Sequence, residues 1–208
     1  MILIGEKKFV VKGKTYILGE EKLPVTDKNK VYYFNYNNTK KYDDLVLEKE
    51  LDNYKFNIGK CYSNTQKLVK ISNNLGIPVK FYSGWLKCGK GEPIHHAWGV
   101  LGKDKIIDVT LDRHINKFAK KLRPFKEEIH RKLFAEIVVK INKLNTSQRV
   151  ILGKVPETLT YYGCPDNKEN ALKTYNNLID KFPEHYNNKL TDEFGYTDMQ
   201  RRIIKERG

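Results

Sequence analysis

Residues 94–111 constrain the fold of this chain most strongly. Two runs of apolar and β-branched residues flank the turn-forming triplet Gly102-Lys103-Asp104, a pattern that predicts two antiparallel strands joined by a tight hairpin. Two side chains with acid–base chemistry, His96 and Asp108, lie inside these runs. The hairpin therefore combines a structural prediction with a possible functional site.

The length of the hairpin loop decides whether His96 and Asp108 share a face. A three-residue loop at 101–103 pairs Val100 with Asp104 and places His96 directly opposite Asp108. Their Cβ atoms would then lie about 4.5–5.5 Å apart, which suits an imidazole N–H that donates to a carboxylate. A two-residue loop would instead put the two side chains on opposite faces of the sheet.

With the three-residue loop, the hairpin divides into two faces. Trp98 and Thr110 share the face of His96 and Asp108, whereas His95 falls on the other side. That other face is the predicted core, and its members are Ala97, Gly99, Leu101, Ile107, Val109 and Leu111. His96 is therefore the better candidate for a catalytic base.

Cys61 is the candidate nucleophile. It follows Gly59-Lys60 and begins a predicted helix over 61–75, which Gly76 ends. Unpaired N–H groups and the dipole at a helix N-terminus favour a thiolate and can point at a developing oxyanion. A thiolate nucleophile needs a base, and the base needs an orienting acceptor, so His96 and Asp108 complete a candidate triad.

Each of these residues also has a structural interpretation. A lone Cys is more often an inert buried residue than a nucleophile, and a His beside Trp is more often a packed, hydrogen-bonded residue. Asp in the middle of a strand is harder to explain in this way, because strands are depleted in Asp and a buried carboxylate needs a partner.

Together these segments resemble the transglutaminase-like superfamily, whose members share a papain-like fold. Four motifs carry the resemblance: Gly59-Lys60-Cys61, Gly76-Ile77-Pro78 before a strand, His96-Ala97-Trp98, and Asp108-Val109-Thr110. The resemblance implies that Cys61 is the nucleophile, His96 the general base and acid, and Asp108 the orienting residue. Small proteins of this type occur in phages and bacteria.

The sequence also departs from the superfamily pattern. Tyr62 follows the nucleophile where many members have Trp, and Val109 stands where Pro is common. Papain-like proteases place a Gln shortly before the Cys as the second oxyanion donor, and Asn57 is the candidate for that role here. Trp98 is a candidate for lining a substrate groove, with strand packing as its alternative.

The remaining pattern favours an α+β domain, in which the nucleophile helix packs on an antiparallel sheet with a helical C-terminal region. We expect residues 1–165 to form a transglutaminase-like α+β domain that includes an N-terminal β-hairpin region, and 166–208 to form a helical extension packed on it. The predicted strands beyond those above are 9–11, 16–18, 31–36, 79–86, 150–152 and 159–162, and the predicted helices are near 129–141, 167–182 and 197–206.

Charge gives the second hypothesis. The formal net charge is +14, and residues 113–150 alone carry 11 basic and 3 acidic side chains. Such a segment can bind phosphates through counterion release, although a solvated helix face also explains it. The alternative function is thus a nucleic-acid-binding or virion-associated protein with a non-catalytic papain-like fold. Its candidate contacts are Arg113, Lys117, Lys120, Lys121 and Arg123.

Cofactor and compartment are constrained by what the sequence lacks. No Cys-x-x-Cys or His-x-x-x-His pair is present, so neither a metal nor another cofactor is expected. Three cysteines without close pairing favour a reducing cytoplasm, that of a bacterial or phage-infected cell. No apolar run approaches the roughly 20 residues that span a bilayer, so no membrane partner is expected.

The triad predicts acyl transfer through a thioester on Cys61, with an amide bond of a protein or peptide as substrate. The positive net charge favours an acidic substrate. Hydrolysis would make the protein a peptidase, isopeptidase or deamidase. Transfer to an amine would make it a transglutaminase. The three residues are common to all these outcomes and do not choose among them.

Overall fold

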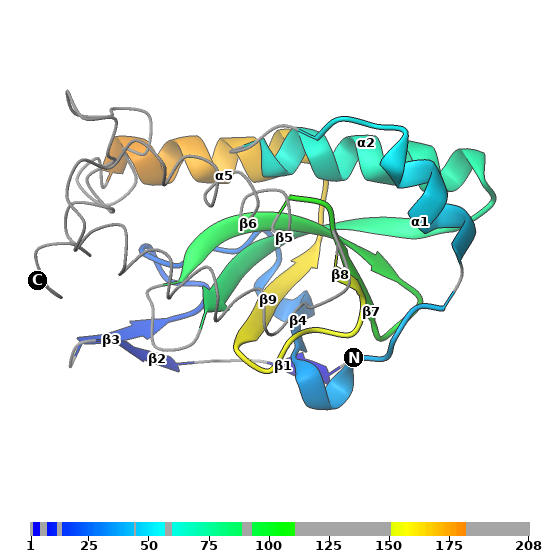
Figure 1. The fold of residues 1–208 in the computed structure, drawn as a ribbon. Helices are drawn as coiled ribbons and strands as arrows, with labels where there is room; N and C mark the ends of the chain where they lie inside the picture. Colours follow the sequence, from blue (N-terminus) through cyan, green and yellow to red (C-terminus); the bar gives the residue numbers. More distant parts are fainter. Residues whose placement is uncertain are drawn as a thin grey trace, which may run out of the picture.

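The computed structural model describes residues 2–4, 8–11, 14–43, 45–56, 60–88, 93–110 and 151–181. This part of the chain is a mixed helix-and-sheet structure, as the predicted α+β class requires (Figure 1). Within it, no helix is long and apolar enough to cross a membrane.

One antiparallel sheet dominates the described structure. It contains seven strands in the order β1-β4-β9-β5-β6-β7-β8. Their bounds are β1 (Ile2–Ile4), β4 (Val31–Phe34), β5 (Val79–Cys88), β6 (Ile94–Leu101), β7 (Lys105–Asp108), β8 (Ile151–Gly153) and β9 (Leu159–Pro165). A separate hairpin pairs β2 (Lys8–Val11) with β3 (Lys14–Ile17), which confirms the N-terminal hairpin that the sequence predicts.

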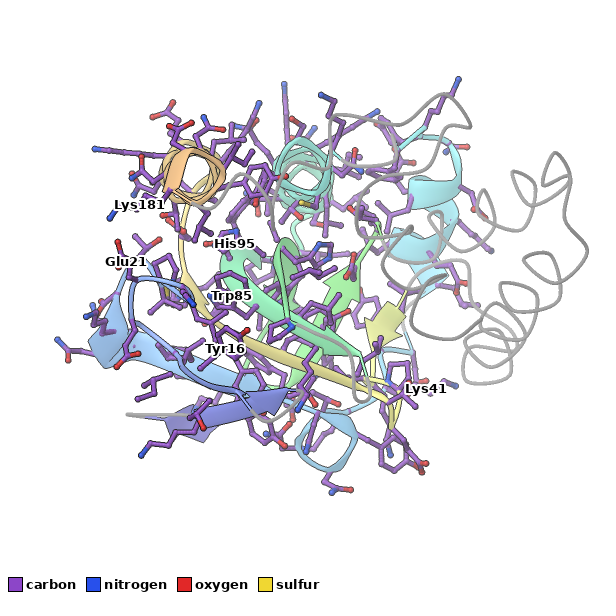
Figure 2. The ribbon with its side chains drawn as sticks, turned by 90° about the vertical axis from the view of Figure 1, so that its left-hand side faces the viewer. Tyr16, Glu21, Lys41, Trp85, His95 and Lys181 are labelled. Carbon is purple, nitrogen blue, oxygen red and sulfur yellow. The ribbon has the colours of Figure 1, made fainter. Side chains whose placement is uncertain are left out.

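The helices gather on one side of this sheet. They are α1 (Leu45–Asp52), α2 (Cys61–Asn74) and α5 (Lys168–Lys181), and short 3-10 helices cover Lys28–Lys30 and Tyr36–Asn38. Figure 2 views α2 and α5 nearly end on, side by side above the sheet. The helix predicted over 61–75 is confirmed, and Gly76 ends it with a φ of 72° that favours glycine.

Gly99 lets α2 approach the sheet closely. A Cβ atom at this position would lie 2.7 Å from Leu68 Cδ2 and 2.7 Å from Val79 Cγ1, too close for any larger residue. Leu68 and Val79 belong to the core between α2 and the sheet, whose other members are Tyr42, Leu47, Leu51, Phe56, Ile71, Ile107, Val109 and Leu152. The absence of a side chain on Gly99 thus lets the middle of α2, at Leu68, pack closely on β6.

A second core lies on the opposite face of β6. Its members are Phe34, Tyr82, Leu86, Trp98, Val100, Ile106, Val155, Leu159 and Tyr161. The sequence predicted core on one face of the hairpin, whereas buried apolar side chains lie on both faces. Figure 1 shows the curl of the sheet. Strand β6 is buried along most of its length.

The described C-terminal helix, α5, packs on the same structure. The Asn167 side chain caps it by accepting from the N–H of Asn170 at 2.9 Å. The Tyr175 ring lies 5.7 Å from that of Tyr62 on α2, and the N–H of Asp166 donates to the carbonyl of Phe81 at 3.0 Å. The helices predicted near 129–141 and over 197–206 lie outside the described residues.

Candidate active site

The β6–β7 register differs by two residues from the one predicted. Leu101 pairs with Lys105, and Gly99 pairs with Ile107, so the loop is 102–104 instead of 101–103. Gly102 takes the left-handed conformation, with a φ of 62°. Strand β6 therefore includes Leu101, which the predicted loop 101–103 had excluded. Because the shift is an even number of residues, side chains keep their faces, and His96 and Asp108 become diagonal instead of directly opposite.

The diagonal arrangement still brings His96 and Asp108 into contact. His96 Nε2 lies 2.7 Å from Asp108 Oδ2, and the two residues are 5% and 0% exposed. The β6–β7 ladder ends at the Gly99–Ile107 pair. His96 therefore lies beyond the part of β6 that pairs with β7, although it still pairs with Gly84 of β5.

Three donors converge on the Asp108 carboxylate. Besides His96, the Tyr161 hydroxyl donates to Oδ2 at 2.9 Å, and the backbone N–H of Thr110 donates to Oδ1 at 2.9 Å. Burial alone would raise the pKa of Asp108, but the His96 charge and these hydrogen bonds lower it below its ordinary value. Asp108 is thus held as a buried carboxylate.

Cys61 completes the arrangement from the first residue of α2. The thiol is buried, and it interacts with the His96 side chain closely enough to raise the pKa of that imidazole. Since Nε2 faces Asp108, Nδ1 is the ring nitrogen left for the sulfur. Lys60 at the N-cap makes no side-chain capping hydrogen bond, so no cap side chain occupies the N–H groups of the first turn.

A second hydrogen bond ties α2 to the end of the hairpin. Asn64 Nδ2 donates to Thr110 Oγ1 at 3.2 Å, and both side chains are buried. Thr110 also supplies the N–H that holds Asp108. Thr110 therefore links the first turn of α2 to Asp108.

The charge state of His96 follows from these contacts. Burial alone would lower its pKa, but the Asp108 charge, the Asp108 hydrogen bond and Cys61 together raise it to about 10. His96 is therefore an imidazolium at neutral pH, paired with a carboxylate.

His95, its neighbour in sequence, lies on the opposite face of β6, as the strand parity predicts. Its Nδ1 is 2.8 Å from the Tyr62 hydroxyl, and its ring meets Trp85 edge-on at 5.1 Å. Figure 2 shows His95 between the helix layer and the sheet, next to Trp85. Burial, with the charge of His96, lowers the pKa of His95 to about 3, so this histidine is neutral.

Of the remaining sequence candidates, the structure describes only Trp98. Trp98 is 0% exposed and packs against Tyr161 with ring centroids 4.9 Å apart, so it packs in the core and lines no groove. Asn57 lies outside the described residues, as do the basic residues Arg113, Lys117, Lys120, Lys121 and Arg123. Among the residues that are described, no group of three or more His, Cys, Asp or Glu side chains could hold a metal ion.

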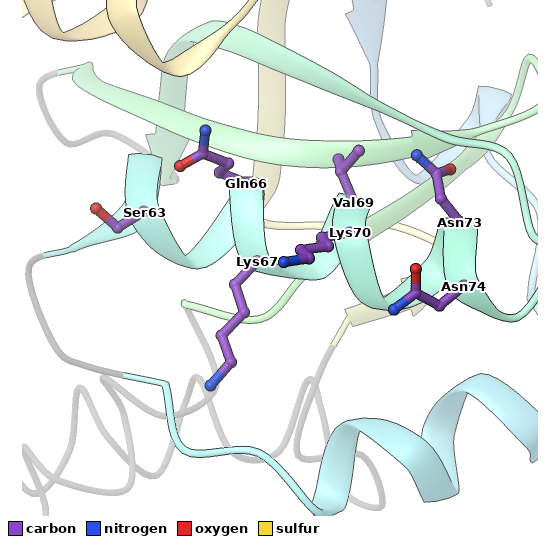
Figure 3. Close-up of a pocket in the computed structure, with 7 residues that line it drawn as sticks. All are labelled: Ser63, Gln66, Lys67, Val69, Lys70, Asn73 and Asn74. Carbon is purple, nitrogen blue, oxygen red and sulfur yellow. The ribbon is translucent and has the colours of Figure 1, made fainter.

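A groove on the outer surface of α2 is separate from the triad (Figure 3). It is lined by Ser63, Gln66, Lys67, Val69, Lys70, Asn73 and Asn74. Most of these side chains are exposed. Lys67 Nζ lies over the Tyr54 ring, 4.8 Å from its centroid. Cys61 lies on the same helix, but it is buried and does not line this groove.

No protein-family model, curated protein or solved structure matches this chain. The comparisons therefore assign the chain to no family. The transglutaminase-like resemblance stays a prediction, and the functional argument depends on the geometry of the site.

Proposed function

We propose that this protein is a cysteine-dependent acyltransferase or hydrolase that acts on an amide bond of a protein or peptide through a Cys61 thioester. One observation carries the proposal: three elements bring Cys61, His96 and Asp108 into one connected chain of interactions. Asp108 orients His96 at 2.7 Å, and His96 interacts with Cys61. A nucleophile, a base and an acceptor that orients the base are the parts that covalent catalysis requires.

In the first half of the reaction, His96 holds the proton of the Cys61 thiol and leaves a thiolate beside an imidazolium. The sulfur attacks the carbonyl carbon of the amide, and the carbonyl oxygen becomes an oxyanion. The N–H groups of the first turn of α2 stabilise this oxyanion. Asp108 keeps the imidazolium oriented throughout this step.

In the second half, the imidazolium donates its proton to the leaving nitrogen, the carbon–nitrogen bond breaks, and the thioester remains. Water or an amine then gives a proton to His96 and attacks the thioester, and the thiolate leaves. Water yields the acid, and an amine yields a new amide. Exclusion of water from the site decides between them.

The fold is consistent with a papain-like, transglutaminase-like core. The nucleophile begins a helix that packs on an antiparallel sheet, and the base and the acid lie on adjacent strands of that sheet. On this basis we also propose that the protein acts in the cytoplasm of a bacterial or phage-infected cell. Neither a metal nor another cofactor enters the reaction as written.

Acetyl transfer from p-nitrophenyl acetate tests the proposal. We expect p-nitrophenol release, or an acetyl group mapped to Cys61 by mass spectrometry, with either signal removed in Cys61→Ser. Cys164→Ser is the matched control, because Cys164 is another buried free cysteine in the described structure and burial raises its pKa. If neither signal in the wild type exceeds the level in Cys61→Ser, the proposal that Cys61 is the nucleophile is refuted.

The charge of the chain favours an anionic partner as a second candidate. Electrostatic binding of DNA or RNA would weaken steeply as salt rises, and it would be unaffected by Cys61→Ser. The basic segment 113–150 can also coexist with an enzyme function and attract an acidic protein substrate. Salt-dependent DNA binding without any Cys61-dependent acetyl transfer would favour the non-catalytic alternative.

A further inference from the structure

Tyr161 contacts the candidate acid from a distant part of the chain. Its hydroxyl donates to Asp108 Oδ2 at 2.9 Å across 53 residues of sequence. Both side chains are 0% exposed. The acceptor is the same oxygen that lies 2.7 Å from His96 Nε2, so the phenol and the imidazole share one carboxylate oxygen.

The packing around Tyr161 fixes this contact. Its ring meets Trp98 edge-on at 4.9 Å and lies 6.4 Å from the His96 ring. Trp98 in turn covers Gly163, where a Cβ would lie 2.6 Å from Trp98 Cη2. A bare Cα at Gly163 therefore lets the indole hold the Tyr161 ring against the hairpin.

The shared oxygen gives Tyr161 a role that changes during the proposed reaction. While His96 is an imidazolium, its charge stabilises the Asp108 carboxylate. When His96 gives its proton to the leaving group, that carboxylate loses its positive partner inside the protein, where an unpaired charge is costly. The Tyr161 hydroxyl and the Thr110 N–H still donate to it, so Asp108 stays ionised while His96 is neutral.

We propose that Tyr161 is a positioning residue of the active site, which holds Asp108 in its ionised form and thereby makes the His96 proton easier to release. This inference rests on the proposed function of Cys61, His96 and Asp108. Tyr161 touches no reacting atom in this role and acts through Asp108. In the described structure, Cys61 interacts with His96, the Trp98 ring stacks on the His96 ring, and Thr110 and Tyr161 donate to Asp108. The charge of His96 also acts on His95.

Replacing Tyr161 with Phe keeps the ring and removes the donor. Without the Tyr161 hydroxyl, the Asp108 oxygen that faces His96 is more basic. The ionised form of Asp108 is also less stable once His96 is neutral. Both effects make the imidazolium hold its proton more tightly. We expect the pKa of His96 to rise by about one unit, the size of one ordinary hydrogen bond.

Tyr162→Phe is the matched control. Tyr162 is adjacent in sequence, lies on the other face of β9, and packs against Tyr33 with ring centroids 5.1 Å apart. Tyr162→Phe removes the same hydroxyl group from the neighbouring tyrosine and leaves the Tyr161–Asp108 hydrogen bond in place. A general loss of packing in the sheet would affect both variants.

The experiment follows the His96 ring by 15N-resolved NMR titration of the full-length protein. In Tyr161→Phe we expect a raised His96 pKa and a downfield shift of its Nε2 proton, with neither change in Tyr162→Phe. A His96 pKa that is unchanged or lowered in Tyr161→Phe would overturn the inference.

The acetyl-transfer assay separates the two proposals. If wild type transfers acetyl through Cys61 but Tyr161→Phe leaves the His96 titration unchanged, the Tyr161 inference fails alone. If Tyr161→Phe shifts the titration while wild type shows no Cys61-dependent transfer, the proposed function fails. In that case Tyr161 tunes a structural ion pair, and its role as an active-site residue fails with it.

Discussion

The two neighbouring histidines of β6 have pKa values that are shifted in opposite directions. His96 faces an ionised carboxylate and a thiol, and its pKa is raised to about 10. His95 faces Tyr62 and Trp85, and its pKa is lowered to about 3. Both are buried, so the partner, and not the burial, decides which histidine carries a charge.

This contrast separates a structural histidine from a candidate catalytic one. The His95 contacts, a tyrosine hydroxyl and aromatic rings, are those of a packed side chain. The His96 contacts place a buried positive charge between the Asp108 carboxylate and the thiol of Cys61, the candidate nucleophile. The same strand therefore presents an uncharged face to α2 and α5 and a charged pair at the end of its ladder with β7.

The largest expected effect comes from removing the negative partner of His96. Asp108→Asn keeps the side-chain shape but leaves a buried imidazolium without its counter-charge, so the pKa of His96 should fall below 6.5. We expect the free energy of unfolding to decrease by about 3–5 kcal/mol. Urea unfolding and NMR titration measure the two quantities. A His96 pKa still near 10 in this variant would mean that Asp108 is not the group that raises it.

The pH dependence of stability should divide between the two histidines. His96 has a raised pKa, so its stabilising contribution is complete below pH 6.5 and is lost as the pH rises from 6.5 towards 10. His95 has a lowered pKa, so the unfolded chain binds its proton first, and stability is lost as the pH falls from 6.5 towards 3. The curve of unfolding free energy against pH thus has an acid limb and an alkaline limb, each with a limiting slope of about 1.4 kcal/mol per pH unit.

Matched variants assign the two limbs. His96→Gln should flatten the alkaline limb and leave the acid limb, and His95→Gln should do the reverse. Unfolding in urea at a series of pH values gives both curves. The same limb flattened by both variants would contradict the separation of the two faces.

A smaller effect is expected from Tyr62→Phe. The change removes the hydroxyl that meets His95 Nδ1 at 2.8 Å and leaves a buried nitrogen without that partner, so stability should fall by about 1–3 kcal/mol. The His96 titration should not change, although Tyr62 follows Cys61 directly in the sequence. A shifted His96 pKa in Tyr62→Phe would show that the two faces are coupled.

The sequence predicted the local elements of the site better than their register. Alternation along β6 placed His96 and His95 on the correct faces, because parity survives an even shift. The loop was placed one residue too early, since local pattern alone does not show where the left-handed Gly102 falls. The apolar spacing after Cys61 and the glycine at its end were enough to locate α2.

Long-range contacts were beyond the sequence. Tyr161 is one of two adjacent tyrosines on β9, and nothing in their spacing shows which one reaches Asp108. Asn64 and Thr110 are ordinary polar residues until α2 and the hairpin are placed together. Trp98 was an open choice between a groove and the core, and only the enclosure of the second sheet face decides for the core.

The most direct test of the account is the rate of Cys61 alkylation by iodoacetamide at neutral pH, with the site mapped by mass spectrometry. We predict that His96→Gln slows this alkylation, because the side chain that interacts with the Cys61 thiol is lost. His95→Gln should leave the rate unchanged. Equal rates of Cys61 alkylation in the wild type and in His96→Gln would contradict a functional pairing of Cys61 with His96.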